Sequence, residues 1–407
     1  MVITGAGVVS SLGFSRDELH RRLSAGESAV RFMPDWAEFM QAEFDVVAAP
    51  VELDEATVKS INRRHRRSMA NAALFAALAA QSAVSESGLS RETLSSGRTG
   101  CIVSSTVGSA SAMFDSCKAV IERRFEDLSA CQFFRLVSHS SAFNTANLFG
   151  ITGVQLSPCS ACASSLQSIG LAYEQIRSGR QEVFLAGGSD EATAMVTGSF
   201  SQLYALAEGS AYPPGRRSRP FDAARGGLVC GEGAGMLVVE ELEHALSRGA
   251  GILAEIKGYA TNCTGSEISQ SDSSSIVRCM QAALADAQTA PDDVDYLSAH
   301  ATSTVAGDRE EAAAIREVFG ERVPVSSLKG ALGHTLGASG AIETSAVIEM
   351  MRRGEILPTA NLENVAEDCR GIWLPEKTVK KDVKTVLKNC IAFGGVNASL
   401  VLAEYVN

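Results

Sequence analysis

The sequence lacks the features expected of a membrane or nucleic-acid protein. Its longest apolar stretches, such as ANAALFAALAAQSAV, are Ala-rich and too short to cross a bilayer. The first residues, MVITGAGVVSSLG, include no basic segment, so we expect no signal peptide. The 407 residues carry a formal net charge of -11, whereas a nucleic-acid-binding protein presents a basic face. We therefore expect no membrane span and no nucleic-acid partner.

Paired metal-ligand motifs are also scarce. Cys159 and Cys162 form a single CxxC, and no second CxxC and no HxxxH occurs anywhere in the chain. A structural zinc ion needs four ligands, usually as two pairs, so we expect no metal. The ten cysteines are otherwise scattered, mostly among apolar residues. That pattern favours reduced thiols in a cytoplasmic protein over a disulfide framework.

What the sequence does contain is an alternation of short β-rich runs with Ala-rich helical stretches. The expected strands are 2–10, 100–106, 154–159, 182–188 and 235–242, followed by 254–261, 295–301, 323–327, 387–395 and 399–406. The clearest helical patterns are 68–89, 164–179 and 275–290. This alternation predicts an α/β protein with buried central strands.

The two sets of strands indicate one plan used twice. Each set contains a strand that leads to a chemically distinctive residue and then a helix, and each ends with a pair of strands. We place the boundary near residues 243–255, which gives an N-terminal half of residues 1–245 and a C-terminal half of residues 246–407. No flexible linker separates the halves, so we expect them to share one layered core.

The stretch SPCSACASSLQSIG (157–170) leaves several interpretations of its two cysteines open. They could form half of a zinc site, a redox pair or simple packing, or one could be a nucleophile. Cys162 is the better nucleophile because it lies in the first turn of a predicted helix, where unpaired N–H groups stabilise a thiolate. Its neighbours are small, so an acyl group could reach the sulfur. Cys159 is expected to pack on the strand side.

Two of the six histidines differ in setting from the other four. His300 ends an apolar strand, and His334 lies in a Gly-rich loop that opens a helix. Both are therefore at predicted strand-to-helix junctions, where the sites of α/β proteins collect. A lone histidine on an apolar face is more often a core residue, but two at matching junctions favour a site.

Several motifs together resemble a known family. They are VITGAGVVSSLG (2–13), SACASS (160–165), RPFDAARGGLVCGEGAGMLVVE (219–240), SAHATSTVAGD (298–308), LKGALGHTLGASGA (328–341) and AFGGVNASL (392–400). Their order and separations resemble those of the β-ketoacyl-acyl-carrier-protein synthases that use a cysteine and two histidines. The resemblance runs from residue 2 to about residue 405. It implies the thiolase fold, with two similar α/β halves in a five-layered α-β-α-β-α core, and a dimer.

The resemblance also implies roles for residues. Cys162 would accept an acyl group from the phosphopantetheine of an acyl carrier protein, and His300 and His334 would stabilise the charge that develops when malonyl-carrier protein loses CO2. The N–H groups of Cys162 and Phe393 would form an oxyanion hole. Lys329 would give electrostatic support and could pair with Glu311. Asp308 and Glu311 would orient the site, and Gly394 would give Phe393 backbone freedom. No cofactor is implied beyond the carrier's own phosphopantetheine.

Two departures from the ordinary fatty-acid members predict a specialised role. The segment YATNCTGSEISQSDSSS (259–275) lacks the aromatic-His pair and the Pro of those members, and Ala392 and Val396 stand where other residues are usual. These positions line acyl and pantetheine channels in the family. We expect a polyene, polyketide or other specialised acyl pathway.

Partners and rival functions follow from the same resemblance. An acyl carrier protein is acidic, so a local basic patch must attract it, and the candidate is Arg63, Arg64, Arg66 and Arg67. PPGRRSRPF (213–221) is a second basic cluster, which an internal network with carboxylates would also explain. The chain could form a homodimer or a heterodimer with a ketosynthase-like chain-length-factor subunit. The rival functions are a pocket-shaping subunit with little activity alone and a thiolase.

Overall fold

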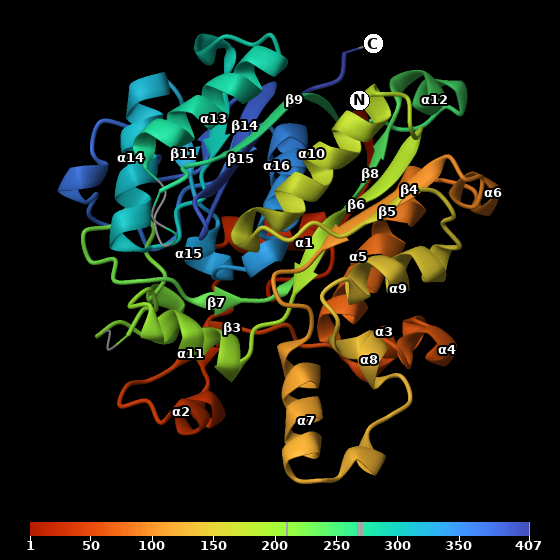
Figure 1. Ribbon diagram of the computed structural model, residues 1–407. Coiled ribbons are helices and arrows are strands. Elements are labelled where there is room, and N and C mark those ends of the chain that lie inside the picture. The colour runs from red at the N-terminus through yellow and green to blue at the C-terminus, as the bar shows by residue number, and fades with distance from the viewer. Residues whose placement is uncertain (209–210, 267, 269–271, 407) are drawn as a thin grey trace.

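The core of the protein is one sheet of ten strands within the residues that the computed structural model describes, which are 1–208, 211–266, 268 and 272–406. The strand order is β11-β10-β14-β15-β9-β1-β8-β6-β4-β5 (Figure 1). These strands are β1 (Val2–Ser10), β4 (Thr99–Ser104), β5 (Gln155–Leu156), β6 (Val183–Asp190), β8 (Gly233–Glu240), β9 (Ala254–Cys263), β10 (Tyr296–Ser298), β11 (Val325–Ser326), β14 (Thr385–Ala392) and β15 (Val396–Ala403). Two small sheets are formed by β2 (Arg31–Phe32), β3 (Val47–Ala49) and β7 (Cys230–Gly231), and by β12 (Glu355–Ile356) and β13 (Val379–Lys380).

The ten strands repeat one topology. From its outer edge inward, the first half runs β5-β4-β6-β8-β1 and the second runs β11-β10-β14-β15-β9. In each half the two outer pairings are parallel and the two inner pairings are antiparallel. Within the large sheet, the halves meet between β1 and β9, where Val2 pairs with Glu255 and Ile3 pairs with Ala254. The predicted duplication is therefore confirmed, whereas the boundary after residue 245 falls inside α12 (Leu242–Ser247) and stays a prediction.

Helices complete the five layers. On one outer face, α5 (Asn71–Ser87) and α9 (Ser140–Phe149) cover strands of the first half. Between the halves, α10 (Ser164–Arg177) and α16 (Ser339–Arg353) contact strands of both. On the other outer face, α13 (Ser273–Asp286) covers β9 and β15, with α14 (Val305–Phe319) beside it (Figure 1). The residues that end the central strands therefore face the N-termini of the middle helices.

Further helical elements occur along the chain. The α-helices are α1 (Arg16–Ser24), α2 (Pro34–Met40), α3 (Glu55–Ser60), α4 (Arg63–Arg66), α6 (Arg91–Leu94), α7 (Ala110–Ile121), α8 (Gln132–Leu136), α11 (Ala194–Gln202) and α15 (Lys329–Leu332). The 3-10 helices are η1 (Phe125–Asp127), η2 (Ala161–Ala163), η3 (Pro214–Arg216), η4 (Pro291–Asp293), η5 (Leu336–Ala338) and η6 (Glu367–Cys369). Among the described residues, no helix combines the length and apolarity needed to span a bilayer.

Close approach of β1 and α5 explains the small residues in both. A Cβ added at Gly5 would lie 2.1 Å from the carbonyl oxygen of Ala83, and one at Gly7 would lie 1.9 Å from that of Ala79. These distances are far below van der Waals contact, so only glycine fits at either position. The Ala-rich face of α5 thus lies directly on the strand, and the two elements form a tightly packed part of the core.

Several predicted strands are shorter in the structure, for identifiable reasons. β10 ends at Ser298, before His300, because the Glu311 carboxylate accepts the N–H groups of His300 and Ala301. The segment predicted as strand 154–159 is a strand only over Gln155–Leu156, so Cys159 lies in the loop that follows. Of the departing segment 259–275, residues 267 and 269–271 lie outside the described residues.

Candidate active site

A strained turn presents Cys162 at the start of the middle helix α10. Cys162 is in η2, and the residue before it, Ala161, has φ +46, a left-handed conformation that is uncommon for a residue with a side chain. The side chain of Cys162 is buried. Among the described residues, the Cys162 N–H donates to no acceptor of another residue. The turn therefore directs both a thiol and a free N–H group into the site.

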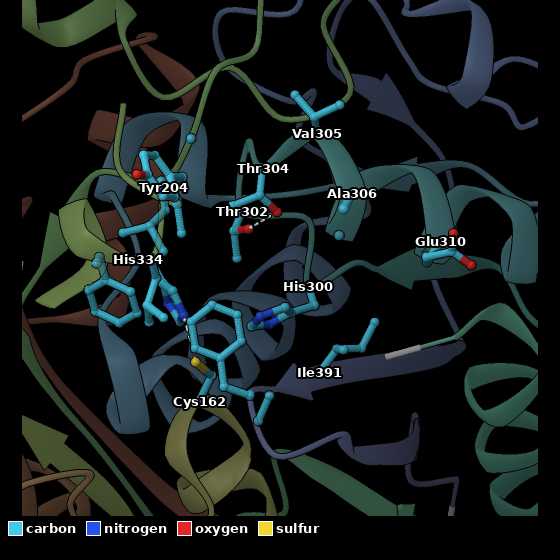
Figure 2. Close-up of a pocket in the computed structure, with 18 of the residues that line it drawn as sticks. Cys162, Tyr204, His300, Thr302, Thr304, Val305, Ala306, Glu310, His334 and Ile391 are labelled. Atoms are coloured by element: carbon cyan, nitrogen blue, oxygen red, sulfur yellow. Dashed lines mark hydrogen bonds between the residues drawn. The ribbon is translucent and has the colours of Figure 1, made fainter. Parts of the chain in front are cut away.

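Both predicted histidines meet this cysteine. His334 Nε2 lies 2.9 Å from Cys162 Sγ, and the His300 and His334 rings are 5.2 Å apart in an edge-to-face arrangement. Figure 2 shows the three side chains together at one end of a cavity. Residues from both halves of the duplicated fold thus form a single site.

The shape of the loop around His334 comes from its backbone contacts with the segment before β8. The His334 N–H donates to the carbonyl oxygen of Val229, and the His334 carbonyl oxygen accepts from the N–H of Gly231. A Cβ added at Gly231 would lie 2.5 Å from the carbonyl oxygen of Leu332. The motif 219–240 therefore holds the second histidine in place.

Hydrogen bonds to the other ring nitrogen assign the tautomer of His334. Its Nδ1 accepts from the N–H of Leu336 at 3.3 Å and lies 3.0 Å from the hydroxyl of Ser339. Since Nδ1 is an acceptor, the proton of the neutral ring is on Nε2. His334 therefore donates Nε2–H toward the sulfur of Cys162.

Burial keeps both imidazoles neutral. It lowers the pKa of His300 and of His334 well below 6.5, and the ammonium groups of Lys329 and Lys388 lower both further. Burial also raises the pKa of the Cys162 thiol to about 12, against the opposing effect of Lys329. The resting site accordingly holds a thiol beside two neutral rings, each able to donate one N–H.

Lys329 does not pair with Glu311 as the sequence suggested. The Lys329 ammonium lies 2.6 Å from Oε1 of Glu343, a buried residue of α16. The Glu311 carboxylate instead accepts hydrogen bonds from backbone N–H groups of the turn that carries His300. The pairing predicted for Lys329 was therefore wrong, because Glu311 already serves two backbone donors.

Asp308 and Glu311 together shape the turn after β10. Asp308 accepts the N–H groups of Thr302 and Ser303 through Oδ1 and that of Phe221 through Oδ2. Burial raises the pKa of Asp308 to about 7 and also raises the pKa of Glu311. These two carboxylates replace the backbone pairing that a longer strand would have supplied.

Phe393 and the glycines after it form another wall of the site. The Phe393 ring lies 5.9 Å from that of Phe200, and Gly394 and Gly395 have φ +88 and φ +72. A Cβ added at Gly394 would meet nothing within 4 Å. In the described part of the chain the Phe393 N–H donates to no acceptor of another residue, as is also true of Cys162. The oxyanion hole expected from the N–H groups of Cys162 and Phe393 stays a prediction.

The cavity has a volume of about 350 Å³. Besides the cysteine and the histidines, polar side chains line its far wall, where Thr302, Thr304 and Glu310 are seen in Figure 2. Its remaining lining is Phe200, Leu203, Tyr204, Ala205, Gly226, Gly227, Leu228, Ile276, Val305, Ala306, Gly307, Ile391, Ala392 and Phe393. Of the two departing positions of this loop, Ala392 is part of the wall, whereas Val396 is not among the lining residues.

A metal ion is a poor match for the three ligand-type side chains. Their ligand atoms, from Cys162, His300 and His334, lie within 4.8 Å of one another. However, the His334 nitrogen that faces the sulfur carries the proton, and Lys329 and Lys388 bring positive charge close to both rings. A cation would need the opposite tautomer and a less positive surrounding.

The two basic clusters differ. In the α4 cluster, Arg63, Arg64 and Arg67 are exposed, while Arg66 donates from Nε to the carbonyl oxygen of Ile61. The second cluster is an internal network: Arg219 bonds to Asp222 and Glu363, and Arg217 to Asp45. Only the α4 cluster leaves several guanidinium groups at the surface.

Cys159 is not the packed residue that the sequence suggested. It is exposed, and its Sγ lies 3.3 Å from the carbonyl oxygen of Thr106. The prediction failed because it assumed that the strand continued to residue 159, whereas β5 ends at Leu156.

Comparisons with known proteins agree with this geometry. Residues 1–245 match the family model of the β-ketoacyl synthase N-terminal domain, and residues 253–363 match that of the C-terminal domain. The chain belongs to the β-ketoacyl synthase family. Its members are acyltransferases that condense acyl groups, and the present synthase is an enzyme of this type.

Relatives match this synthase over its whole length. The 3-oxoacyl-[acyl-carrier-protein] synthase 1 of Escherichia coli K12 is 37% identical over 99% of this chain and 98% of its own. A β-ketoacyl synthase structure from Burkholderia phymatum STM815 superimposes with a TM-score of 0.94 at 39% identity, covering 100% of this chain and 99% of the other. The ishigamide ketosynthase/chain length factor gives a TM-score of 0.91 at 31% identity and the same coverage. The predicted family and thiolase fold are both confirmed.

Two charged residues of the synthase site were missed by sequence reasoning. Glu343 is the one carboxylate in the small-residue segment SGAIETSAV, and Lys388 is the one cation inside the apolar strand β14. Both are buried. A lone charge inside a segment that must be buried was the available signal, because such a charge needs a partner.

Proposed function

We propose that the protein catalyses a decarboxylative Claisen condensation of an acyl group on Cys162 with malonyl-acyl-carrier protein. The products would be β-ketoacyl-carrier protein and CO2. The observation that carries the proposal is the meeting of Cys162 Sγ, His334 Nε2–H and the neutral His300 ring in one cavity. This set supplies a nucleophile and two hydrogen-bond donors, which is what the two stages need.

In the first stage, the sulfur of Cys162 attacks the thioester carbonyl of the acyl-carrier protein. The free N–H groups of Cys162 and Phe393 stabilise the negative oxygen of the tetrahedral intermediate. The intermediate collapses with loss of the phosphopantetheine thiolate. The proton that leaves the Cys162 thiol ends on this departing sulfur, so the transfer needs no net proton donor. Lys329 favours the thiolate as it forms.

In the second stage, malonyl-carrier protein loses CO2 and its carbonyl oxygen becomes an enolate oxygen. Neutral His300 and His334 donate N–H groups to that oxygen. The carbanion attacks the acyl carbonyl on Cys162, the new carbon–carbon bond forms, and the cysteine leaves as a thiolate that takes up one proton. We propose no bound cofactor, since the thiol and the imidazoles supply all groups that these steps use.

The partner we propose is an acyl carrier protein that docks at Arg63 and Arg64 of α4 and at Arg67 directly after it, with Arg66 beside them. Carrier proteins are acidic and the chain as a whole is negative, so attraction has to come from a local patch of exposed guanidinium groups. The name of the Escherichia coli relative includes an acyl carrier protein, which supports the same partner. The ten free cysteines support a reducing, cytoplasmic compartment.

We further propose a specialised acyl chain in place of the ordinary saturated one. The support is that Ala392 and its neighbour Ile391 line the cavity beside Phe393, so the departing loop lies where an acyl chain would pass. The likeness to the ishigamide ketosynthase/chain length factor, at 31% identity, supports this proposal. Competition between saturated and unsaturated acyl-carrier proteins tests it, and equal or better use of the saturated chain would count against it.

A dimer is also part of the proposal. β5 lies at the edge of the sheet, and the side chain of Leu156 there is 40% exposed. An open, apolar strand edge favours pairing with a second chain. That chain could be a copy of this one or a chain-length-factor subunit. The presence of Cys162, both histidines and Lys329 favours an active subunit over a silent one, and a histidine pair in place of a second cysteine disfavours a thiolase.

The condensation itself is tested by supplying acyl-carrier protein and malonyl-carrier protein and measuring β-ketoacyl product and CO2. We expect both in equal amounts. If no product formed from any acyl chain, the test would be repeated with a chain-length-factor partner, and failure in both cases would contradict the proposed function.

A further inference from the structure

Glu343 is shared by two buried lysines behind the histidines. Its Oε1 lies 2.6 Å from the Lys329 ammonium, and its Oε2 lies 2.5 Å from that of Lys388. The Lys388 ammonium also donates to the carbonyl oxygen of Asn389 at 2.6 Å. All three charged side chains are at most 2% exposed. The cluster joins α15, α16 and β14. The helices α15 and α16 flank His334 in the chain, and β14 ends just before Phe393.

This cluster carries more positive than negative charge. Two lysines face one carboxylate, and the nearest further carboxylate, Glu311, is engaged by the N–H groups of His300 and Ala301. With Glu311 ionised the four groups sum to zero, and with Glu311 protonated they sum to +1. In either state, loss of Lys388 lowers the charge near the two imidazoles by one.

Two buried cations act on both histidines. After burial, Lys329 and Lys388 each depress the pKa of both rings, Lys329 more than Lys388. In the described part of the chain, the titratable groups that face the histidines or the cluster are Cys162 on η2, Asp190 on β6, Tyr296 on β10, Asp308, Glu310 and Glu311 on α14, Lys329 on α15, Glu343 on α16, Lys388 and Cys390 on β14, and Tyr204 in the cavity lining.

We propose that Lys388 is a positioning residue that keeps His300 and His334 uncharged by supplying the second cation on Glu343. It touches neither substrate nor ring and acts through charge alone. Because it concerns the imidazoles that donate to the enolate oxygen, the inference rests on the proposed function. A protonated imidazole would instead attract the malonyl carboxylate and hold it against loss as CO2. Because the Lys388 ammonium keeps the imidazoles neutral, it would favour decarboxylation at mildly acidic pH.

The test is an NMR titration of the histidine rings in the full-length protein, which needs no turnover. Lys388→Met removes the charge at similar size, and Lys388→Gln removes it while keeping a donor for Glu343 and Asn389. We expect the pKa of at least one of the two rings to rise by about one unit in both variants, the scale that one nearby buried charge imposes. The acid limb of malonyl decarboxylation should move to higher pH by the same amount.

Two further variants separate charge from structure. Lys388→Arg keeps the charge and should leave the titrations as they are. In Lys388→Met/Glu343→Gln the local charge returns to its original sum, so the ring pKa values should return as well. Unchanged titrations in both Lys388→Met and Lys388→Gln would overturn the inference. If the rings shifted but the protein made no condensation product, the proposed function would fail while the electrostatic role of Lys388 stood.

Discussion

His334 Nε2 lies 2.9 Å from Cys162 Sγ, although 172 residues separate them in the chain. Cys162 is at the start of α10 and His334 precedes α16, and these two helices form the middle layer between the halves of the fold. The duplication therefore brings one chemical group from each half to a common point. The predictions below test whether this contact works as proposed.

Replacing the nucleophile should abolish acyl transfer. In Cys162→Ala no thioester can form, so we expect condensation to fall by at least about a thousandfold. Cys159→Ala is the matched control, because Cys159 is three residues away but exposed. Product formation from acyl- and malonyl-carrier protein measures both. Equal losses in the two variants would point to damage of the turn rather than removal of the nucleophile.

Removing either ring should mainly affect the second stage. His300→Ala and His334→Ala each remove one donor to the enolate oxygen, and we expect CO2 release to fall by about a hundredfold or more. Acylation of Cys162 should persist within about tenfold in His300→Ala, because the hydrogen bond to the sulfur comes from His334 and the two N–H groups proposed for the oxyanion hole are kept. His139→Ala, an exposed histidine outside the cavity lining, is the control. Full CO2 release without His300 would refute its role.

The pH dependence should reflect neutral imidazoles. Because the pKa of each ring lies well below 6.5, both stay uncharged as the pH falls through 6.5, and the loss of activity begins only near the lowered pKa. We expect malonyl decarboxylation to be nearly constant between pH 6 and 8. The rate of CO2 release measured across pH 5 to 9 checks this, and a half-maximal loss at pH 6.5 would contradict it.

The same pKa shifts affect stability with a definite sign. Below pH 6.5 the unfolded chain takes up protons on these histidines that the folded protein does not, so their contribution disfavours folding as the pH falls. The variant His300→Gln should therefore lose stability less steeply than the native protein below pH 6.5. Urea unfolding at pH 5.5 and 7.5 gives the change in free energy of unfolding between the two pH values. This change is then compared between the native protein and His300→Gln.

Charge reversal on α4 should weaken use of carrier-bound substrates. Arg64→Glu/Arg67→Glu would repel an acidic partner, and we expect kcat/KM for acyl-carrier protein to fall by about tenfold or more at low salt. Reaction with a small thioester that lacks the protein should be unchanged. Arg91→Glu, an exposed arginine on α6, is the control. If Arg64→Glu/Arg67→Glu and Arg91→Glu lowered kcat/KM for acyl-carrier protein equally, the docking site would have to be elsewhere.

Packing of β1 against α5 gives a stability prediction. Gly7→Ala would place a Cβ 1.9 Å from a backbone carbonyl oxygen, so we expect a loss of about 2 kcal/mol or more in the free energy of unfolding. At Gly251 an added Cβ meets nothing within 4 Å, and Gly251→Ala should stay within about 0.5 kcal/mol of the native protein. Chemical denaturation measures the free energy of unfolding of both variants. Equal values for Gly7→Ala and Gly251→Ala would contradict close packing of β1 against α5.

Much of the site could be predicted from residues of distinctive type at junctions between elements. Cys162, His300 and His334 were identifiable because a thiol and imidazoles at strand-to-helix turns are chemically specific, and the motifs around them are long. Duplication was visible because both halves repeat the same order of elements. These features depend on local sequence and on the residue types themselves.

The charged cluster could not be predicted in the same way. The family resemblance suggested a pairing of Lys329 with Glu311, but Glu311 accepts two backbone N–H groups and the lysine pairs with Glu343. Lys388 has no partner near it in sequence that would reveal its role. Cys159 was misplaced because the length of β5 depends on its single neighbour, β4, and not on the apolar pattern. Pairings fixed by tertiary packing were therefore the part that the sequence left open.

The most direct test of the central claim is the intact mass of the protein after incubation with an acyl-carrier protein and no malonyl partner. The account predicts an increase equal to one acyl group, located on the peptide that contains Cys162 and absent from Cys162→Ala. An acyl group on another residue, or an equal mass increase in Cys162→Ala, would contradict it.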